Sequence, residues 1–396
     1  MDQKPFIVGT GIDTVKINIK LLDGDGAVAE EQKLPEQMLT ALHDWQEKAL
    51  EKGKPIPTSM SSFHDARLMM FPNGAPAWKY IVRNDCLEIK LAPRLSMAMV
   101  AKITLQSSYL WEMGDIHKAI EEVRAFLRKE FGPYLALQMA QLDLCVDLVG
   151  LQLPTEWERM FLSQAKIKRE MSKTEKDAVI YRGRELETVM FSGHGRPLSC
   201  KMYNKVLEIK QHAKEKTWFF PIWLRVKDKA GNPLWDGNAP VWRVEYSVER
   251  EGLGQMGFEG VDETILNIKR IWEYCTQEWL RMVQPGRTKN RARWATHPTW
   301  ILLQHAFDNY GNEAVEGLGP IVRERRREKN IEQAVAAFAG YSTTYAAWED
   351  MILDDDTCAP ELFSLIYEKV LERWKNRGIS PVDVIRDKKF IYSQVP

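Results

Sequence analysis

The sequence lacks the features that mark membrane and secreted proteins. No apolar run approaches the roughly 18 residues that a membrane-spanning helix needs. The first residues, MDQKPFIVGTGIDTVKINI, have no basic segment followed by a long apolar core, so they indicate a strand and not a signal peptide. We therefore expect a soluble protein that stays in the cytoplasm and engages no membrane.

Several familiar site motifs are missing as well. The five cysteines are scattered, and no two form a C-x-x-C pair, so buried free thiols are expected instead of disulfides or a zinc knuckle. There is no G-x-x-x-x-G-K-[ST] and no G-x-S-x-G, which argues against an ATPase and an α/β-hydrolase. Gly9 and Gly11 are too few glycines for a dinucleotide-binding turn.

The chain has no excess of either charge, with 55 basic and 55 acidic residues. Strong non-specific nucleic-acid binders usually carry excess positive charge, so the neutral total is a warning against that class. The basic residues do gather locally, with 13 Lys/Arg against 7 Asp/Glu in 164–216 and 10 against 5 in 281–330. These segments are either two solvated faces or a localised DNA footprint.

Apolar spacing predicts an α+β chain in two parts. The 396 residues, 44% of them hydrophobic, are enough for two or three domains. The predicted elements before residue 260 are strands at 11–20, 138–150, 187–193, 198–205 and 242–249, a meander over 66–92, and helices at 35–53 and 116–131, the latter capped by Asp115. Helical patterns dominate afterwards, at 262–283, 299–309, 328–339 and 360–376. We therefore predict an antiparallel-sheet domain at 1–260 and a helical domain at 261–396.

Three acids lie on the predicted strands. Asp143 and Asp147 share one face of their strand with Cys145, and Glu245 shares a face with Arg243. Rigid strands are good platforms for aiming metal ligands. The alternative is a solvent-facing row on a half-buried sheet.

A third cluster, Tyr203, Lys205 and Glu208, lies where a strand passes into a helix. Tyrosine is a poor nucleophile near pH 7 because its pKa is about 10. A neighbouring lysine and a divalent cation would both favour the phenolate, and the glutamate could help to hold the cation. The alternative is a half-buried tyrosine beside a surface lysine and glutamate.

The order of these pieces resembles the Rep-trans family of replication initiation factors. The matching segments are GIDTVKINI (11–19), QLDLCVDLV (141–149), TVMFSGHGRPLSCKMYNKVLE (188–208) and WRVEYSVE (242–249). Members of that family initiate rolling-circle replication of small plasmids, and related members are relaxases. The chain departs from the family pattern at Gln141, where a basic residue is common, and at Lys201 or Met202, where arginine usually precedes the tyrosine.

This resemblance implies a nickase-like fold and a DNA-breaking reaction. Tyr203 would be the catalytic nucleophile, with Lys205 beside it, and would form a 5′-phosphotyrosyl link that leaves a free 3′-OH. A divalent metal, Mg²⁺ or Mn²⁺, would be held by a set of four acids: Asp143, Asp147, Glu208 and Glu245. The partners implied are a replication or transfer origin, a host helicase and a second copy of the chain. No His-x-His occurs, so the paired-histidine metal motif of another large nickase class is absent.

Basic residues before and after the predicted boundary are candidates for binding DNA phosphates. They are Lys201, Arg287, Lys289, Arg291, Arg293, Arg325 and Arg326. Trp294 and Trp300 are candidates for stacking on bases, and 328–350 could include a helix-turn-helix with Gly340 in its turn. The alternatives are a solvated helix face and tryptophans that pack in the core.

Two other functions remain open on the sequence. The chain could be a DNA-binding regulator that keeps the fold without the chemistry, or a relaxase that nicks a conjugative transfer origin. The nicking hypothesis requires the hydroxyl of Tyr203 to open onto a pocket that several carboxylates share.

Overall fold

The computed structural model describes most of the first 310 residues and one helix near the C-terminus. The described residues are 4–93, 99–151, 153, 157–163, 179–182, 185–191, 197–211, 213–288, 290–308, 310, 338–339, 342, 345–346, 358–376, 380 and 382. Residues 1–322 and 323–396 form two compact units.

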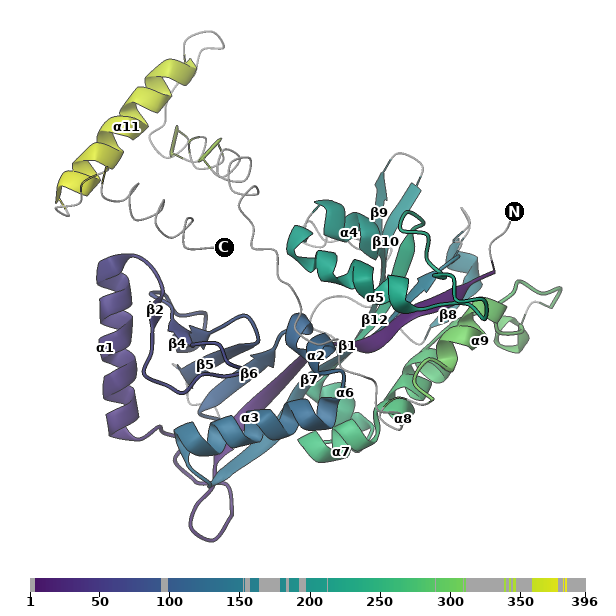
Figure 1. The fold of residues 1–396 in the computed structure, drawn as a ribbon, viewed down its shortest axis with the longest axis horizontal. Helices are drawn as coiled ribbons and strands as arrows, with labels where there is room; N and C mark the ends of the chain where they lie inside the picture. Colours follow the sequence, from purple (N-terminus) through teal and green to yellow (C-terminus); the bar gives the residue numbers. More distant parts are fainter. Residues whose placement is uncertain are drawn as a thin grey trace. The chain divides into compact units, whose positions relative to one another are not determined.

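Eleven described strands form one antiparallel sheet in the order β2-β3-β4-β5-β6-β1-β7-β12-β11-β10-β9 (Figure 1). Their bounds are β1 (Phe6–Leu21), β2 (Ile56–Pro57), β3 (Met69–Met70), β4 (Trp78–Arg83), β5 (Leu87–Pro93), β6 (Ala101–Leu105), β7 (Leu135–Val149), β9 (Val179–Arg182), β10 (Glu185–Phe191), β11 (Leu198–Asn204) and β12 (Val241–Glu249). A separate pair joins β8 (Phe161–Ser163) to β13 (Leu280–Met282). The predicted strands and meander are confirmed.

The described helices of the first unit lie on both faces of the sheet. Its α-helices are α1 (Glu36–Lys52), α2 (Ser107–Met113), α3 (Ile116–Phe131), α4 (Lys205–Gln211), α5 (Phe219–Arg225), α6 (Arg250–Gln255), α7 (Val261–Leu266), α8 (Ile268–Glu273) and α9 (Pro298–Gln304). The second unit contains α11 (Cys358–Asn376). The predicted cap of α3 is confirmed, because the Asp115 carboxylate accepts from the backbone N–H groups of His117 and Lys118.

Two long neighbouring strands, β1 and β7, form the centre of the sheet. β1 has 16 residues and β7 has 15, and they pair over almost their whole length. Alternation in β7 places Leu142 and Leu144 on one face and Asp143 and Cys145 on the other. On the leucine side, the ring of Tyr246 in β12 packs against Trp272 of α8, with centroids 5.3 Å apart.

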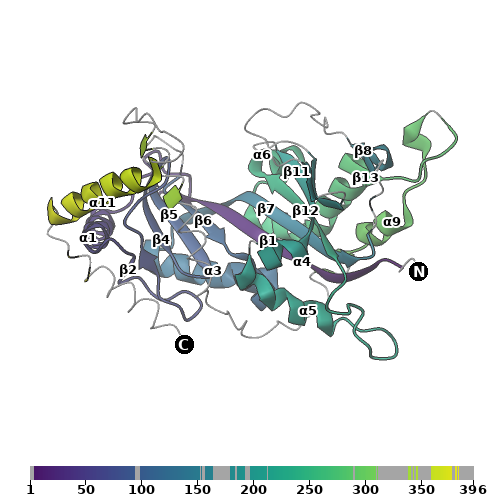
Figure 2. The same cartoon turned by 90° about the horizontal axis from the view of Figure 1, so that it is seen from above.

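The other face is covered by α5. The guanidinium carbon of Arg243 in β12 lies 4.4 Å from the ring centroid of Phe219. Figure 2 shows α5 on one side of the sheet and α6 on the other. Near the site, both faces of β7 and β12 are therefore shielded by helices, and a charge placed there must find a partner within the protein.

The boundary that we predicted at residue 260 is not where the two compact units divide. Helices α7 to α9 belong to the first unit, because their apolar side chains pack on the sheet and on β8. Trp272 contacts β12, and Trp300 contacts Phe161 of β8 with ring centroids 5.7 Å apart. The predicted helix at 262–283 is also interrupted at Asn267 and ends in β13.

Two further expectations concern thiols and membrane spans. Four cysteines in the described residues are free and buried, as predicted: Cys86, Cys145, Cys200 and Cys275. Among the same residues, no helix is long and apolar enough to cross a bilayer.

Candidate functional site

Strand register brings the predicted site residues onto one face of the sheet. Arg243 of β12 is paired with Asp147 of β7 on one side and with Tyr203 of β11 on the other. One step along the strands, Glu245 lies between Cys145 and Lys201. Because paired residues on neighbouring strands point to the same face, these side chains meet in space.

Tyr203 has its hydroxyl between an acid and a cation. The hydroxyl donates to Glu245 Oε2 at 2.9 Å and accepts from Lys205 Nζ at 3.3 Å. The ammonium of Lys201 lies 4.8 Å from the ring centroid. Tyr203 is only 7% exposed, so its hydroxyl does not open as widely as the nicking hypothesis requires.

The environment keeps the phenol protonated. Burial and the Glu245 carboxylate raise the pKa of Tyr203 well above its ordinary value, although Arg243 acts in the opposite direction. We expected the neighbouring lysine to favour the phenolate. In the structure its effect is smaller than that of burial, so the phenolate is not the favoured form.

Lys205 is the first residue of α4, and its side chain is fully buried. Its ammonium lies 2.8 Å from Glu208 Oε2 and 5.2 Å from the ring centroid of Phe219. Burial and the charge of Arg243 lower the pKa of Lys205. The strand-to-helix junction therefore places a cation directly beside the phenol oxygen.

Glu245 is the acid that contacts the phenol. Burial and the charge of Asp13 raise its pKa, which makes this carboxylate a better proton acceptor. Burial alone would raise the pKa of Asp13 too, but Arg243 and Lys205 outweigh it and lower that pKa to about 2. The two neighbouring acids thus have pKa values shifted in opposite directions.

A buried ion network supports this pair. The Arg243 guanidinium donates to Asp147 Oδ1 at 2.7 Å and Oδ2 at 2.8 Å, and to Asp13 Oδ1 at 2.6 Å. Trp223 Nε1 also donates to Asp147 Oδ2, at 3.0 Å. Arg243 and Asp147 are both 0% exposed. Arg243 and Asp13 have no role in the site predicted from the sequence, although both lie in segments that resemble the Rep-trans family.

Two glycines in β1, Gly9 and Gly11, leave room for the indole of Trp111 to pack over this ion network. A Cβ atom at Gly11 would lie 2.8 Å from Trp111 Cζ2, and one at Gly9 would lie 3.2 Å from Trp111 Cη2. The indole of Trp111, from α2, therefore lies directly on the backbone of β1. These glycines serve close packing and not a nucleotide-binding turn.

Asp143 lies further along β7, on the same face. Gln141 Nε2 donates to its two oxygens at 2.8 and 3.0 Å. Burial and the charge of Glu245 raise its pKa to about 7, while hydrogen bonds from Ser247 and Gln141 act against the shift. Its carboxyl is therefore partly protonated at neutral pH.

We expect the Asp143→Asn variant to gain stability over the parent as pH rises. The raised pKa means that Asp143 contributes stability in full below about pH 4, and that this contribution is lost as pH rises through about 7. Between pH 4 and pH 8, the variant should gain on the order of 3 to 4 kcal/mol relative to the parent. Urea unfolding of both proteins in EDTA across this range measures it. Asp44→Asn, on the exposed face of α1, is the control, and equal pH profiles for Asp143→Asn and parent would contradict the assignment.

The four acids predicted to hold a metal do not assemble into a cation site. Asp147 gives both oxygens to a guanidinium, Glu208 pairs with an ammonium, and Asp143 is held by a glutamine. Within the described ranges, no group of three or more His, Cys, Asp or Glu side chains is arranged to hold a metal ion. The residues as arranged do not fit Mg²⁺ or Mn²⁺, and the metal stays a prediction.

Of the predicted DNA-binding residues, Arg287, Arg291 and Arg293 lie in the loop between β13 and α9, and Lys201 lies on β11. All four are exposed. Lys289, Arg325 and Arg326 lie outside the described residues, as do Gly340 and most of the proposed helix-turn-helix at 328–350. Arg291 is bound to the backbone carbonyls of Arg159 and Phe161, at 2.9 and 3.0 Å. These hydrogen bonds anchor the loop to β8 and to the turn just before it.

The two tryptophans near that loop differ. Trp300 is 1% exposed, and its indole N–H donates to the Thr276 carbonyl, so the prediction that it stacks on bases is wrong. Trp294 is half-buried and lies 5.5 Å from the Arg291 guanidinium. Of the two, Trp294 alone keeps part of its ring surface accessible to a base.

The comparisons with known proteins find a likeness in fold and none in sequence. No family model matches the sequence, and no curated protein matches it. The fold is similar to a solved structure described as that of a rolling circle replication initiator protein from Geobacillus stearothermophilus, with a TM-score of 0.40 and 14% identity over 76% of this chain and 96% of that one. A TM-score of 0.40 is too low to transfer residues or activity from that protein.

Proposed function

We propose that this chain is a DNA-nicking transesterase whose Tyr203 attacks a DNA phosphate to start rolling-circle replication. The observation that carries the proposal is the phenol oxygen held between the Glu245 carboxylate and the Lys205 ammonium. A tyrosine with a hydrogen-bonded base and an adjacent cation has the parts of an activated nucleophile. The order of the sequence segments that carry these residues supports a replication initiator.

Glu245 is the proposed general base. It already accepts the phenol hydrogen bond at 2.9 Å, within the reach that proton transfer requires. The raised pKa of Glu245 makes the difference between its pKa and that of the phenol smaller, which favours proton transfer. As the phenol oxygen bonds to phosphorus, its proton passes to Glu245, so no free phenolate needs to form beforehand.

Lys205 is the proposed electrostatic partner. Its ammonium is fully buried and 3.3 Å from the phenol oxygen, where the low dielectric strengthens its attraction for developing negative charge. The new bond joins the oxygen of Tyr203 to phosphorus, and the bond from phosphorus to the 3′ oxygen breaks. The leaving oxygen takes a proton from water. The phosphodiester energy is kept in the covalent link, so a second transesterification can rejoin the strand without ATP.

A nicking assay tests the proposal. Supercoiled DNA that carries the segments flanking the coding gene is incubated with the protein, in Mn²⁺ and in parallel in EDTA. We expect open circles and a DNA-linked protein band that protease removes. The EDTA arm tests the predicted metal separately, and a conjugative transfer origin as substrate separates a relaxase from a replication initiator.

A second candidate is a DNA-binding regulator without chemistry. The 7% exposure of Tyr203 favours it, because a phosphate reaches the phenol oxygen only if the ring or its cover moves. A regulator shifts the DNA in a native gel but produces neither open circles nor a protein–DNA adduct. The same assay therefore separates the two functions.

A further inference from the structure

Lysines on three neighbouring strands share the face of the sheet that carries Tyr203. Lys90 of β5 is paired with Lys102 of β6, which is paired with Asn18 of β1. Lys16 of β1 is paired with Gln141 of β7. We refer to Lys16, Lys90 and Lys102 as the lysine track.

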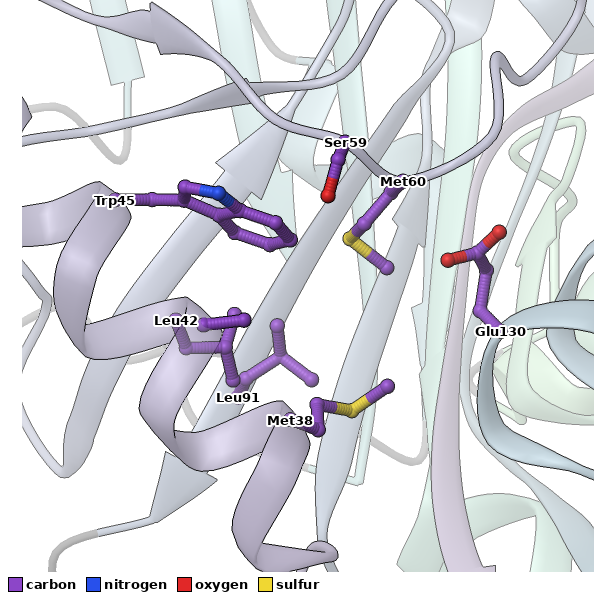
Figure 3. Close-up of a pocket in the computed structure, with 8 residues that line it drawn as sticks. Met38, Leu42, Trp45, Ser59, Met60, Leu91 and Glu130 are labelled. Atoms are coloured by element: carbon purple, nitrogen blue, oxygen red, sulfur yellow. The ribbon is translucent and has the colours of Figure 1, made fainter.

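The opposite face of these strands is the core. Ile17, Ile89 and Ile103 alternate with the lysines and are 0% exposed. Leu91 points toward Met38 and Leu42 of α1, around a cavity of about 120 Å³ (Figure 3). Helix α1 therefore covers the side away from the lysines, and all three lysines are half-buried on the polar side.

The lysine track carries excess positive charge. Lys102 forms no hydrogen bond or ion pair with any described residue, and burial together with Lys16 lowers its pKa. Lys90 pairs with Glu88 at 3.2 Å, and the nearby carboxylate of Glu249 raises the pKa of Lys102 without outweighing burial. Ammonium groups that repel one another and are only partly neutralised form a surface for an anionic ligand.

Polar contacts connect the lysine track to the candidate site. Lys16 Nζ donates to Gln141 Oε1 at 2.7 Å, and Gln141 Nε2 donates to Asp143 and to Ser247 Oγ. From β5 to β11, which carries Tyr203, there are five inter-strand steps of about 4.8 Å each, or roughly 24 Å across the sheet. Along β7, Gln141, which is paired with Lys16, lies six residues from Asp147, which is level with Tyr203, or roughly 20 Å. A strand of DNA that leads from the lysine track to the phenol oxygen would therefore cross the sheet diagonally.

We propose that the lysine track binds the phosphates of a single DNA strand and leads it to Tyr203. The inference rests on the proposed function. Lysine acts as a point charge toward phosphate, and a basic surface that follows the backbone is how proteins hold single strands without reading bases. The strand would therefore be held without sequence preference at this surface.

The test measures DNA binding and not chemistry, in a Tyr203→Phe background. Fluorescence anisotropy with a labelled oligo-dT of about 12 nucleotides, a length within single-strand site sizes, is followed across salt concentrations. Replacing all three lysines with glutamine should weaken binding roughly 50-fold at 0.15 M salt and lower the salt slope by about 2, since each phosphate contact contributes about 0.7. Lys102→Gln alone, which breaks no described bond, should give about a third of the slope change, and the triple arginine variant should restore binding.

The matched control removes three lysines from the other side. Lys33, Lys48 and Lys52, exposed on α1 and just before it, are replaced with glutamine and should leave affinity and slope unchanged. Equal losses in both triple variants, or unchanged binding in the lysine-track variant, would overturn the inference. Preference for a duplex of the same length would overturn it as well. Nicking is assayed separately from binding. A negative result for the lysine track therefore does not bear on the role of Tyr203, which the nicking assay tests.

Discussion

Replacing Tyr203 with phenylalanine is expected to abolish the covalent protein–DNA adduct and to reduce nicking by roughly 10³-fold or more. The substitution removes only the oxygen that would bond to phosphorus, while the ring keeps its packing between Lys201 and Lys205. Glu245 then loses one hydrogen-bond donor at a buried site, so the variant should be less stable by about 1 to 3 kcal/mol. Denaturing gels before and after protease digestion measure the adduct, and anisotropy shows that DNA binding persists.

Tyr246→Phe provides the matched control for this change. Tyr246 is the next residue after Glu245 on the same strand, but its ring packs on the opposite face against Trp272. Its loss of a hydroxyl should leave nicking intact. An adduct that survives in Tyr203→Phe would assign the nucleophile elsewhere, and loss in both variants would point to a general effect of altering the core.

Strand positions could be predicted because alternation is a local property. The apolar residues of β7 recur every second position, and Asp115 has the side chain that a helix N-cap requires. The end of the predicted helix at 262–283 could not be predicted in this way. Met282 continues the spacing of three and four residues that joins Trp272, Cys275 and Trp279, so the helical pattern extends through it. Only pairing with β8, more than a hundred residues earlier, makes this segment β13.

In the candidate site too, local spacing was predictable and long-range pairing was not. Spacing placed Asp143 and Asp147 on one face, and the structure places them there. Their partners depend on register between strands that are far apart in the chain, so Arg243 opposite Asp147 could not be read from spacing. The metal set was predicted from the family resemblance and from the positions of the acids on strands. It overlooked that an arginine on the same face competes with a cation for the same carboxylate oxygens.

Arg243→Met is expected to destabilise the folded chain by about 3 to 5 kcal/mol, the largest effect on stability that we predict. Methionine fills much of the space of the arginine stem but leaves Asp147 as a fully buried charge, with Trp223 as its one remaining side-chain donor among the described residues. Asp13 loses the guanidinium that lowers its pKa. Denaturant unfolding at pH 7, followed by circular dichroism and tryptophan fluorescence, measures the change.

A second substitution separates the loss of the ion pair from the loss of packing. Asp147→Asn combined with Arg243→Met removes the uncompensated charge, so the double variant should regain at least half of the lost stability. A deficit that persists in the double variant would mean that Arg243 stabilises the sheet by its contacts with Phe219 and Trp111 and not by its charge.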